Sequence, residues 1–247
     1  MSNTSDNASV GVKIEHAETD LTKGTITNTT VQRVDPVLAA KIWQTNADLI
    51  ADVARLGYLH RYDIILDPTF GRGTWWKRWT PAPPGRLVAH DLNPRLSPTG
   101  ESCDFRNLPY DRDTFDAVVL DGPYKLNGTS TVSVDERYGV ECYASWQDRH
   151  TLIRDGMTEC SRVLRGGGVL LVKCQDQVCS GRIRWQSDEF SAHGATLGLV
   201  KVDQFYFLGG GRPQPARSRM DGKVSGQQHA YGRPSCLLVF ARDHTSI

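Results

Sequence analysis

The chain has 247 residues, 39% of them apolar and 23% charged, which is an ordinary composition for a soluble globular enzyme. Its 29 basic and 28 acidic side chains give a net charge of +1, which excludes a polybasic or polyacidic tail protein but leaves room for a basic nucleic-acid face. No apolar run is long enough to span a membrane, and the polar N-terminus lacks the apolar core of a secretion signal. The cysteines show no metal-ligand spacing, so we expect reduced thiols, no metal and a cytoplasmic location.

A change of composition near residue 35 divides the chain. Residues 1–34 are rich in Ser, Thr, Asn and Asp, and we expect them to form a flexible polar arm. Residues 35–247 carry alternating apolar segments, and we expect them to form a single domain. Asp35-Pro36 is typical of a helix start, and apolar residues then recur at helical spacing as far as Gly57, which should end that helix.

Beyond this helix, short apolar runs alternate with helical segments. Such alternation predicts a mostly parallel α/β sheet with helices on both faces. The last two strands have no helix between them and should form an antiparallel pair at one edge. Ligands of these sheets bind at the carboxyl ends of the strands, where Asp67, Asp91 and Asp121 fall. The predicted strands are 62–67, 86–91, 115–121, 169–174, 200–208 and 236–242, and the predicted helices are 74–79 and 145–164.

The turn after the first strand, Asp67-Pro-Thr-Phe-Gly-Arg-Gly-Thr74, indicates a nucleoside-type cofactor once its neighbours are considered. A dinucleotide fingerprint needs a third glycine, and a phosphate loop needs Gly-Lys-Ser/Thr, so neither NAD nor ATP is favoured. Asp91, at the end of the next strand, suits bidentate hydrogen bonding to a ribose diol. Asp104 is placed to accept from an adenine amino group while Phe105 covers the ring.

The most specific feature is Asp121-Gly-Pro-Tyr124, at the end of the third strand. Here the sequence resembles the class I S-adenosylmethionine-dependent methyltransferases of the amino-group branch, which carry D/N/S-P-P-Y/F/W at this position. Leu66–Thr74 resembles that branch's D-P-F-x-G-x-G-T turn, and Asp91-Leu-Asn-Pro94 resembles its ribose-binding strand end. Arg162–Gly168 is similar to the R-V-L-K-P-G-G turn, and His229–Phe240 to the closing strand of many bacterial and phage DNA amino-methylases.

This resemblance covers about residues 35–242. It implies a Rossmann-like methyltransferase fold with a mostly parallel seven-stranded sheet and an antiparallel edge hairpin. It also implies S-adenosylmethionine as cofactor and methyl transfer to the exocyclic amine of a base in DNA, adenine N-6 first and cytosine N-4 second. An orphan, a phage or a restriction-modification enzyme would fit equally. The cofactor-binding residues carried over are Asp67, Pro68, Phe70, Gly71, Gly73, Thr74, Asp91, Leu92, Asp104 and Phe105.

The tetrapeptide is expected to supply the catalytic residues Asp121, Gly122, Pro123 and Tyr124. An exocyclic amine is a poor nucleophile because its lone pair is delocalised into the ring. The Asp121 carboxylate and the Gly122 carbonyl would accept its two N–H bonds and aim the lone pair at the methyl sulfonium. Tyr124 would stack on a base flipped out of the duplex. Gly122 stands where the family has its first proline, which keeps the carbonyl but leaves the backbone less rigid.

Two segments are expected to contact the substrate. Residues 209–235 form a basic, Gly- and Pro-rich loop that would track phosphates, unless it is only a solvated loop. Residues 125–147 would close over the extruded base or act as an ordinary lid. Neither segment is long enough to be a recognition domain of ~80 residues. The recognised sequence is therefore either short, or a homodimer or another partner supplies the specificity. The predicted substrate-binding residues are Lys125, Arg212, Arg217, Arg219, Lys223 and Arg233.

Two other functions remain open. An RNA base amino-methyltransferase would share these motifs but usually adds an RNA-binding domain, for which residues 1–34 are too short and too polar. A catalytically silent methyltransferase-like subunit is hinted at only by Gly122, and the intact remainder of the tetrapeptide argues against it. Among the neighbouring groups, the tryptophans of residues 75–79 are expected to pack rather than stack on a base, and Gln175-Asp-Gln177 to play a supporting polar role.

Overall fold

The computed structural model describes residues 38, 43–126, 145–207 and 234–243, and two short strands near the N-terminus. The chain divides into two units, residues 1–39 and 40–247. In the first unit, β1 (Glu18–Thr19) pairs antiparallel with β2 (Ile26–Thr27). The remainder of the predicted arm, and its boundary at residue 35, lie outside the described residues.

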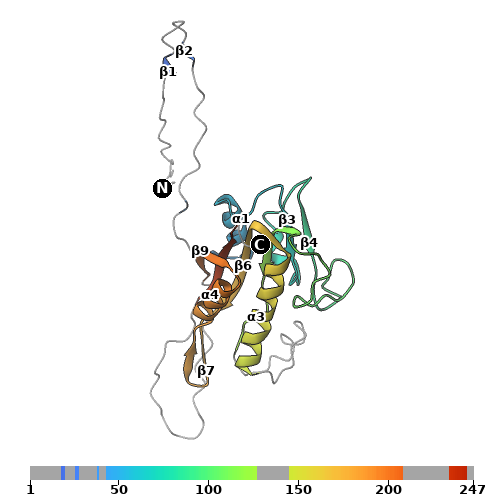
Figure 1. Cartoon of the computed structure of the whole chain (residues 1–247), viewed down its shortest axis with the longest axis vertical. Coiled ribbons are helices and arrows are strands. Elements are labelled where there is room, and N and C mark those ends of the chain that lie inside the picture. Colours follow the sequence, from blue (N-terminus) through green and yellow to red (C-terminus); the bar gives the residue numbers. More distant parts are fainter. Residues whose placement is uncertain are drawn as a thin grey trace, which may run out of the picture. The chain divides into compact units, whose positions relative to one another are not determined.

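The second unit is built on a mixed sheet (Figure 1). Its strand order is β4-β3-β5-β6-β10-β9. The four strands from β4 to β6 are parallel, whereas β10 runs antiparallel to both of its neighbours. The predicted antiparallel pair at the sheet edge is therefore confirmed, and β10 is its inner member. The strands are β3 (Ile64–Asp67), β4 (Arg86–Ala89), β5 (Phe115–Leu120), β6 (Leu164–Gln175), β9 (Leu199–Phe207) and β10 (Ser235–Arg242).

Within the described part of the chain this sheet has six strands, so a seventh strand is not seen there. Beyond β4, the outer position is occupied by an isolated parallel bridge between Asp91 and Ser102. Pro94 and Pro98 lie between these two residues and cannot donate a ladder hydrogen bond. The connection between Asp91 and Ser102 therefore runs through turns.

Helices cover both faces of the sheet, as predicted. The helix predicted from Asp35 is wrong at its start, because residues 43–45 are not helical and Thr45 caps α1 through a capping box with Asp48. The predicted end is confirmed, since Gly57 follows the last turn with a φ of 87°. The helices are α1 (Asn46–Arg55), the 3-10 helix η1 (Thr74–Trp76), α3 (Trp146–Val163) and α4 (Gln186–Thr196).

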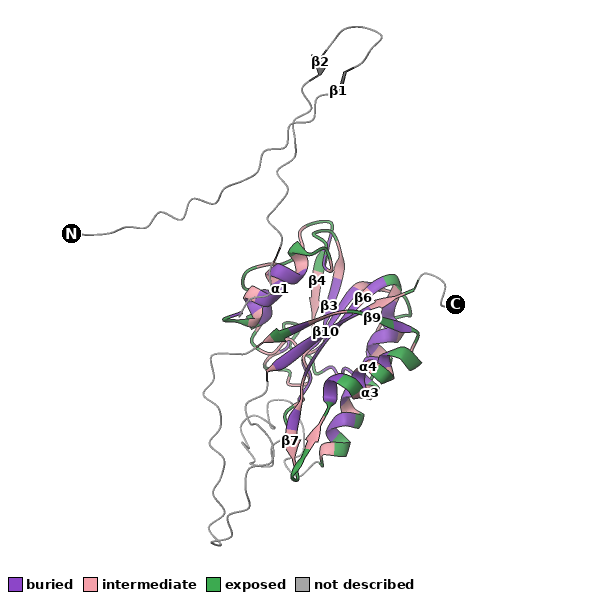
Figure 2. Ribbon diagram, turned by 90° about the vertical axis from the view of Figure 1, so that its left-hand side faces the viewer, coloured by how far each residue is buried: buried purple, intermediate pink, exposed green. Residues whose placement is uncertain are grey.

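Two hydrophobic cores lie on opposite faces of the sheet, because alternate residues of each strand point to opposite sides. On β5, Val118 and Leu120 join the core under α3 and α4, while Ala117 and Val119 join the core under α1 and η1. Figure 2 shows the buried residues running along the central strands. None of the described helices is both long and apolar enough to cross a bilayer.

In the second unit, one hairpin and one helix were not predicted. β7 (Gln177–Cys179) and β8 (Arg182–Arg184) form a hairpin directly after β6, closed by Ser180 and Gly181, which both have positive φ. The other is α4, whose eleven residues contain one large apolar side chain, the buried Phe190. A helix with so narrow an apolar face has little hydrophobic periodicity for sequence reasoning to detect.

Candidate active site

Three predicted aspartates lie at one edge of the sheet. Asp67 ends β3, Asp121 follows β5 directly, and Asp91 comes just after β4. Because these strands are parallel neighbours, their carboxyl ends meet at the same edge. The sheet therefore brings together acids that are far apart in the sequence.

Asp67 is buried and organises the turn that follows it. Its Oδ1 accepts hydrogen bonds from the Thr69 N–H (3.0 Å) and the Thr69 hydroxyl (3.2 Å), and its Oδ2 accepts from the Trp76 indole (2.7 Å). Burial raises the pKa of Asp67 to about 7, although these hydrogen bonds lower it and the nearby Asp121 raises it. The Thr69 hydroxyl also accepts from the Asp121 N–H (2.9 Å), so it ties the end of β3 to the end of β5.

The glycine turn holds Asp91. The Gly71 N–H donates to Asp91 Oδ2 (2.8 Å), and the Asn93 N–H donates to Oδ1 (2.8 Å). Burial raises the pKa of Asp91, and these two backbone donors oppose the rise. Gly73 has a φ of 62°, and a Cβ there would lie 2.6 Å from the Phe70 ring, so only glycine fits. A Cβ at Gly71 would meet no atom closer than 3.9 Å, so the space above this backbone is open.

The structure places Asp104 and Phe105 differently from the other predicted cofactor residues. Arg106 binds Asp104 through its side chain, with its Nη2 2.6 Å from Oδ2, and holds the pKa of that carboxyl below its usual value. Phe105 is 6% exposed and packs in the core against Gly156 of α3. The cofactor roles of this pair stay predictions, as do those of Pro68, Thr74 and Leu92, which lie in the turns after β3 and β4.

Asp121 has one oxygen engaged and one enclosed without a partner. Oδ2 accepts from the Trp75 indole N–H (2.9 Å), while Oδ1 is buried and receives no hydrogen bond from the described residues. Burial raises the pKa of Asp121, and the positive charge of Lys173, the Trp75 hydrogen bond and Lys125 oppose that rise. A buried acceptor without a donor is costly in a folded protein, so Oδ1 is suited to receive a donor from a ligand.

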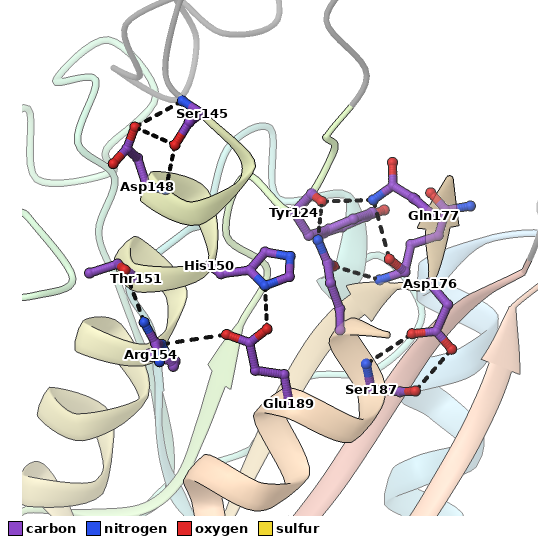
Figure 3. Close-up of polar contacts among 12 residues, drawn as sticks. Tyr124, Ser145, Asp148, His150, Thr151, Arg154, Asp176, Gln177, Ser187 and Glu189 are labelled. Carbon is purple, nitrogen blue, oxygen red and sulfur yellow. Dashed lines mark hydrogen bonds and ion pairs between the residues drawn. The ribbon is translucent and has the colours of Figure 1, made fainter. Parts of the chain in front are cut away.

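Two glutamine side chains hold the backbone of the tetrapeptide. The Tyr124 carbonyl accepts from the side-chain amides of Gln177 (2.8 Å) and Gln186 (2.8 Å), and Gln177 Oε1 accepts from the Leu126 N–H (3.2 Å). Figure 3 shows Gln177 reaching Tyr124. The supporting role predicted for Gln175-Asp-Gln177 is therefore seen in Gln177, whereas Gln186 gave no sequence signal because it lies on the unpredicted α4.

The departure from proline at position 122 has a steric cause. A Cβ on Gly122 would lie 2.3 Å from Cδ1 of Ile153, a fully buried residue of α3. Proline carries a Cβ as well, so either proline or alanine at this position would require Ile153 Cδ1 to shift within the core. The Gly122 carbonyl accepts a hydrogen bond from the Tyr124 N–H (2.8 Å), which fixes the turn and leaves its second lone pair for another donor.

Three polar roles were missed by sequence reasoning. Trp75 and Trp76 are buried, which confirms that they pack, but their indole N–H groups also bind Asp121 and Asp67. Lys173 is 2% exposed on β6 and donates to Asn46 Oδ1 (2.5 Å). A lysine inside an apolar strand run was the one available signal, because lysine is almost never fully buried unless it is paired.

Most of the predicted substrate-binding residues cannot be placed. Lys125 is exposed, directly after the tetrapeptide. Arg212, Arg217, Arg219, Lys223 and Arg233 lie outside the described residues, as do residues 127–144 of the predicted lid.

Comparison with known proteins finds resemblance in structure only. No protein-family model and no curated protein matches the chain. Among solved structures, a SAM-dependent methyltransferase from Methanosarcina mazei matches at 11% identity, covering 77% of this chain and 97% of that one, with a TM-score of 0.44. YcgJ from Bacillus subtilis matches at 12% identity, 80% and 98% coverage and a TM-score of 0.49. The N-methyltransferase NodS from Bradyrhizobium japonicum matches at 14% identity, 78% and 93% coverage and a TM-score of 0.47.

These identities and TM-scores leave the activity to be inferred from the site. The sheet itself, with parallel strands, helices on both faces and an inserted antiparallel strand, is Rossmann-like.

Proposed function

We propose that this chain is an S-adenosylmethionine-dependent methyltransferase that acts on the exocyclic amino group of a base in DNA, adenine N-6 first and cytosine N-4 second. The observation that carries the proposal is the Asp121 carboxylate, whose buried Oδ1 has no donor within the part of the chain that the structure describes. It lies at the carboxyl end of β5, where such a sheet binds its ligands, and is followed by the Gly122 carbonyl. Together these two oxygens would accept both N–H bonds of a primary amine.

The residues at the neighbouring strand ends fit the cofactor. The open space above Gly71 admits a ligand close to the backbone, and the buried Asp91 carboxylate keeps lone pairs for a ribose diol. When bound, S-adenosylmethionine would supply an electrophilic methyl group on sulfur. Asp121 and Gly122 would hold the amine so that its nitrogen lone pair forms the new N–CH₃ bond while the S–CH₃ electrons pass to sulfur. The proton lost from nitrogen would leave through Asp121 Oδ1 to water.

Nucleic acid is proposed as the substrate because of where the basic loop is attached. Residues 209–235 carry five basic side chains and connect β9 to β10. β9 and β6 both run antiparallel to β10, so Phe207, at the end of β9, lies at the same sheet edge as Asp121. Cations on this loop and at Lys125 would track a phosphate backbone beside the pocket.

The test is nucleoside mass spectrometry of total DNA and RNA from a host that lacks its own DNA methylases. The chain is expressed beside a matched Asp121→Asn variant, which keeps the shape but removes the charge. We expect methylated adenine or cytosine in DNA that disappears in the variant. Modification in RNA alone would replace DNA by RNA as the substrate. No new mark in either pool, with cofactor still bound by the purified protein, would refute the proposed activity.

A further inference from the structure

Lys173 is a buried cation next to the proposed catalytic carboxylate. It is 2% exposed, and its Nζ lies 2.5 Å from Asn46 Oδ1, 4.9 Å from the centre of the Trp75 ring and 4.5 Å from that of Phe207. Removing an ammonium group from water is unfavourable unless other groups compensate its charge. One amide oxygen and two ring faces compensate only in part, so an anion nearby is needed to hold this charge.

Asp121 is that anion, and the sheet register places it beside Lys173. Leu120, the last residue of β5, pairs with Val172 of β6, so Asp121, directly after β5, comes beside Lys173 of β6. Trp75 connects them, because its ring face lies against the ammonium while its indole N–H donates to Asp121 Oδ2 (2.9 Å). Oδ2 is thereby fixed, and Oδ1 is the oxygen without a donor.

We propose that Lys173 and Trp75 form a positioning pair that keeps the Asp121 carboxylate ionised and presents its Oδ1 to the substrate amine. This inference rests on the proposed function for the identity of the amine. It assigns Lys173 no contact with substrate or cofactor. Lys173 acts through charge, and Trp75 acts through the orientation of the carboxylate.

The causes of the pKa shifts of Asp121 and Lys173 agree with this pairing. Burial raises the pKa of Asp121, and Lys173 is the first of the groups that oppose this. Burial lowers the pKa of Lys173, and Asp121 is the first of the groups that oppose that change. The other titratable groups that act on the pair are Lys125, Asp67, Cys174 and Cys236.

The decisive experiment measures the titration of Asp121 without requiring any activity. The chain is labelled with ¹³C at the aspartate carboxyls, and Asp121→Asn assigns the signal. Lys173→Met removes the charge while keeping the length of the side chain, and Lys173→Arg restores the charge. Lys201→Met, at an exposed position of β9, is the matched control. We expect the midpoint of Asp121 to rise by about one pH unit or more in Lys173→Met and to stay near the wild-type value in the other two.

A second arm uses Trp75→Phe, which keeps a ring in the core but removes the N–H. In single-turnover methyl transfer to duplex DNA, we expect the rate at saturation to fall about tenfold or more, with cofactor affinity unchanged. In the same assay the acid limb of the pH–rate profile should move upward in Lys173→Met by as much as the NMR midpoint moves.

The two proposals fail separately. An Asp121 midpoint that does not move in folded Lys173→Met overturns the positioning pair, even if DNA is methylated. If Lys173→Met does not fold, a Trp75→Phe variant with the wild-type rate overturns it. A shifted midpoint together with no methylation of DNA supports the pair and refutes the proposed substrate.

Discussion

Gly122 and Ile153 should behave as a coupled pair in a double-mutant cycle. A Cβ at position 122 would lie 2.3 Å from Ile153 Cδ1, whereas the next nearest atoms, Ile153 Cγ1 and Phe105 Cζ, are both 3.8 Å away. Ile153→Val removes Cδ1 and keeps Cγ1. The structure therefore predicts that one methyl group decides whether alanine fits.

The size of the effect follows from core packing. Gly122→Ala alone should lower the free energy of unfolding by about 1–3 kcal/mol, because the overpacked core must shift. Ile153→Val alone should lower it by about 0.5–1.5 kcal/mol. The double variant should be close to Ile153→Val alone, which gives a favourable coupling of about 1–3 kcal/mol.

Urea denaturation of the four proteins measures this coupling. Ile65→Val, a buried residue of the opposite core, is the matched control and should combine additively with Gly122→Ala. Additivity between Gly122→Ala and Ile153→Val would refute the steric explanation for the missing proline.

Three further predictions concern the turn and the tetrapeptide. Because burial raises the folded-state pKa of Asp67 to about 7, the free energy of unfolding should fall as the pH rises from about 4 to about 7. In urea titrations, Asp67→Asn should reduce the loss of stability between about pH 5 and pH 7 by about 2 kcal/mol. An unchanged loss in this variant would contradict the reasoning. Gly73→Ala should weaken the binding of S-adenosylhomocysteine, measured by calorimetry, by about tenfold or more, because the new Cβ would meet the Phe70 ring. The control is Gly100→Ala, which also has a positive φ (75°) but lies in open space and should leave that affinity unchanged. Gln177→Ala removes one of the two amide donors to the Tyr124 carbonyl and the acceptor of the Leu126 N–H, so the transfer rate should fall by roughly tenfold while cofactor affinity is kept. Equal losses in both would indicate general unfolding.

Much of the fold could be predicted because its signals are local. A buried strand shows as a short apolar run, and the aspartates that follow three of these runs mark the edge of the sheet that binds ligands. The antiparallel pair at the edge followed from the missing helix between the last two strands. Of the predicted seventh strand, the described residues show an isolated bridge between Asp91 and Ser102, and α4 was missed because Phe190 is its one large apolar residue.

The acids of the candidate site were predicted from the sequence, but the residues that contact them were not. By itself the sequence determined which acids reach the edge of the sheet, because strand ends and glycine turns are set by neighbouring residues. Only the tertiary structure decided that Lys173 lies beside Asp121, that Ile153 packs against Gly122, and that Phe105 belongs to the core. These contacts depend on the order of strands in the sheet and on which helix packs over them. Spacing along the chain does not encode that order, so the contacts of a residue such as Lys173 can be identified only once the sheet is assembled.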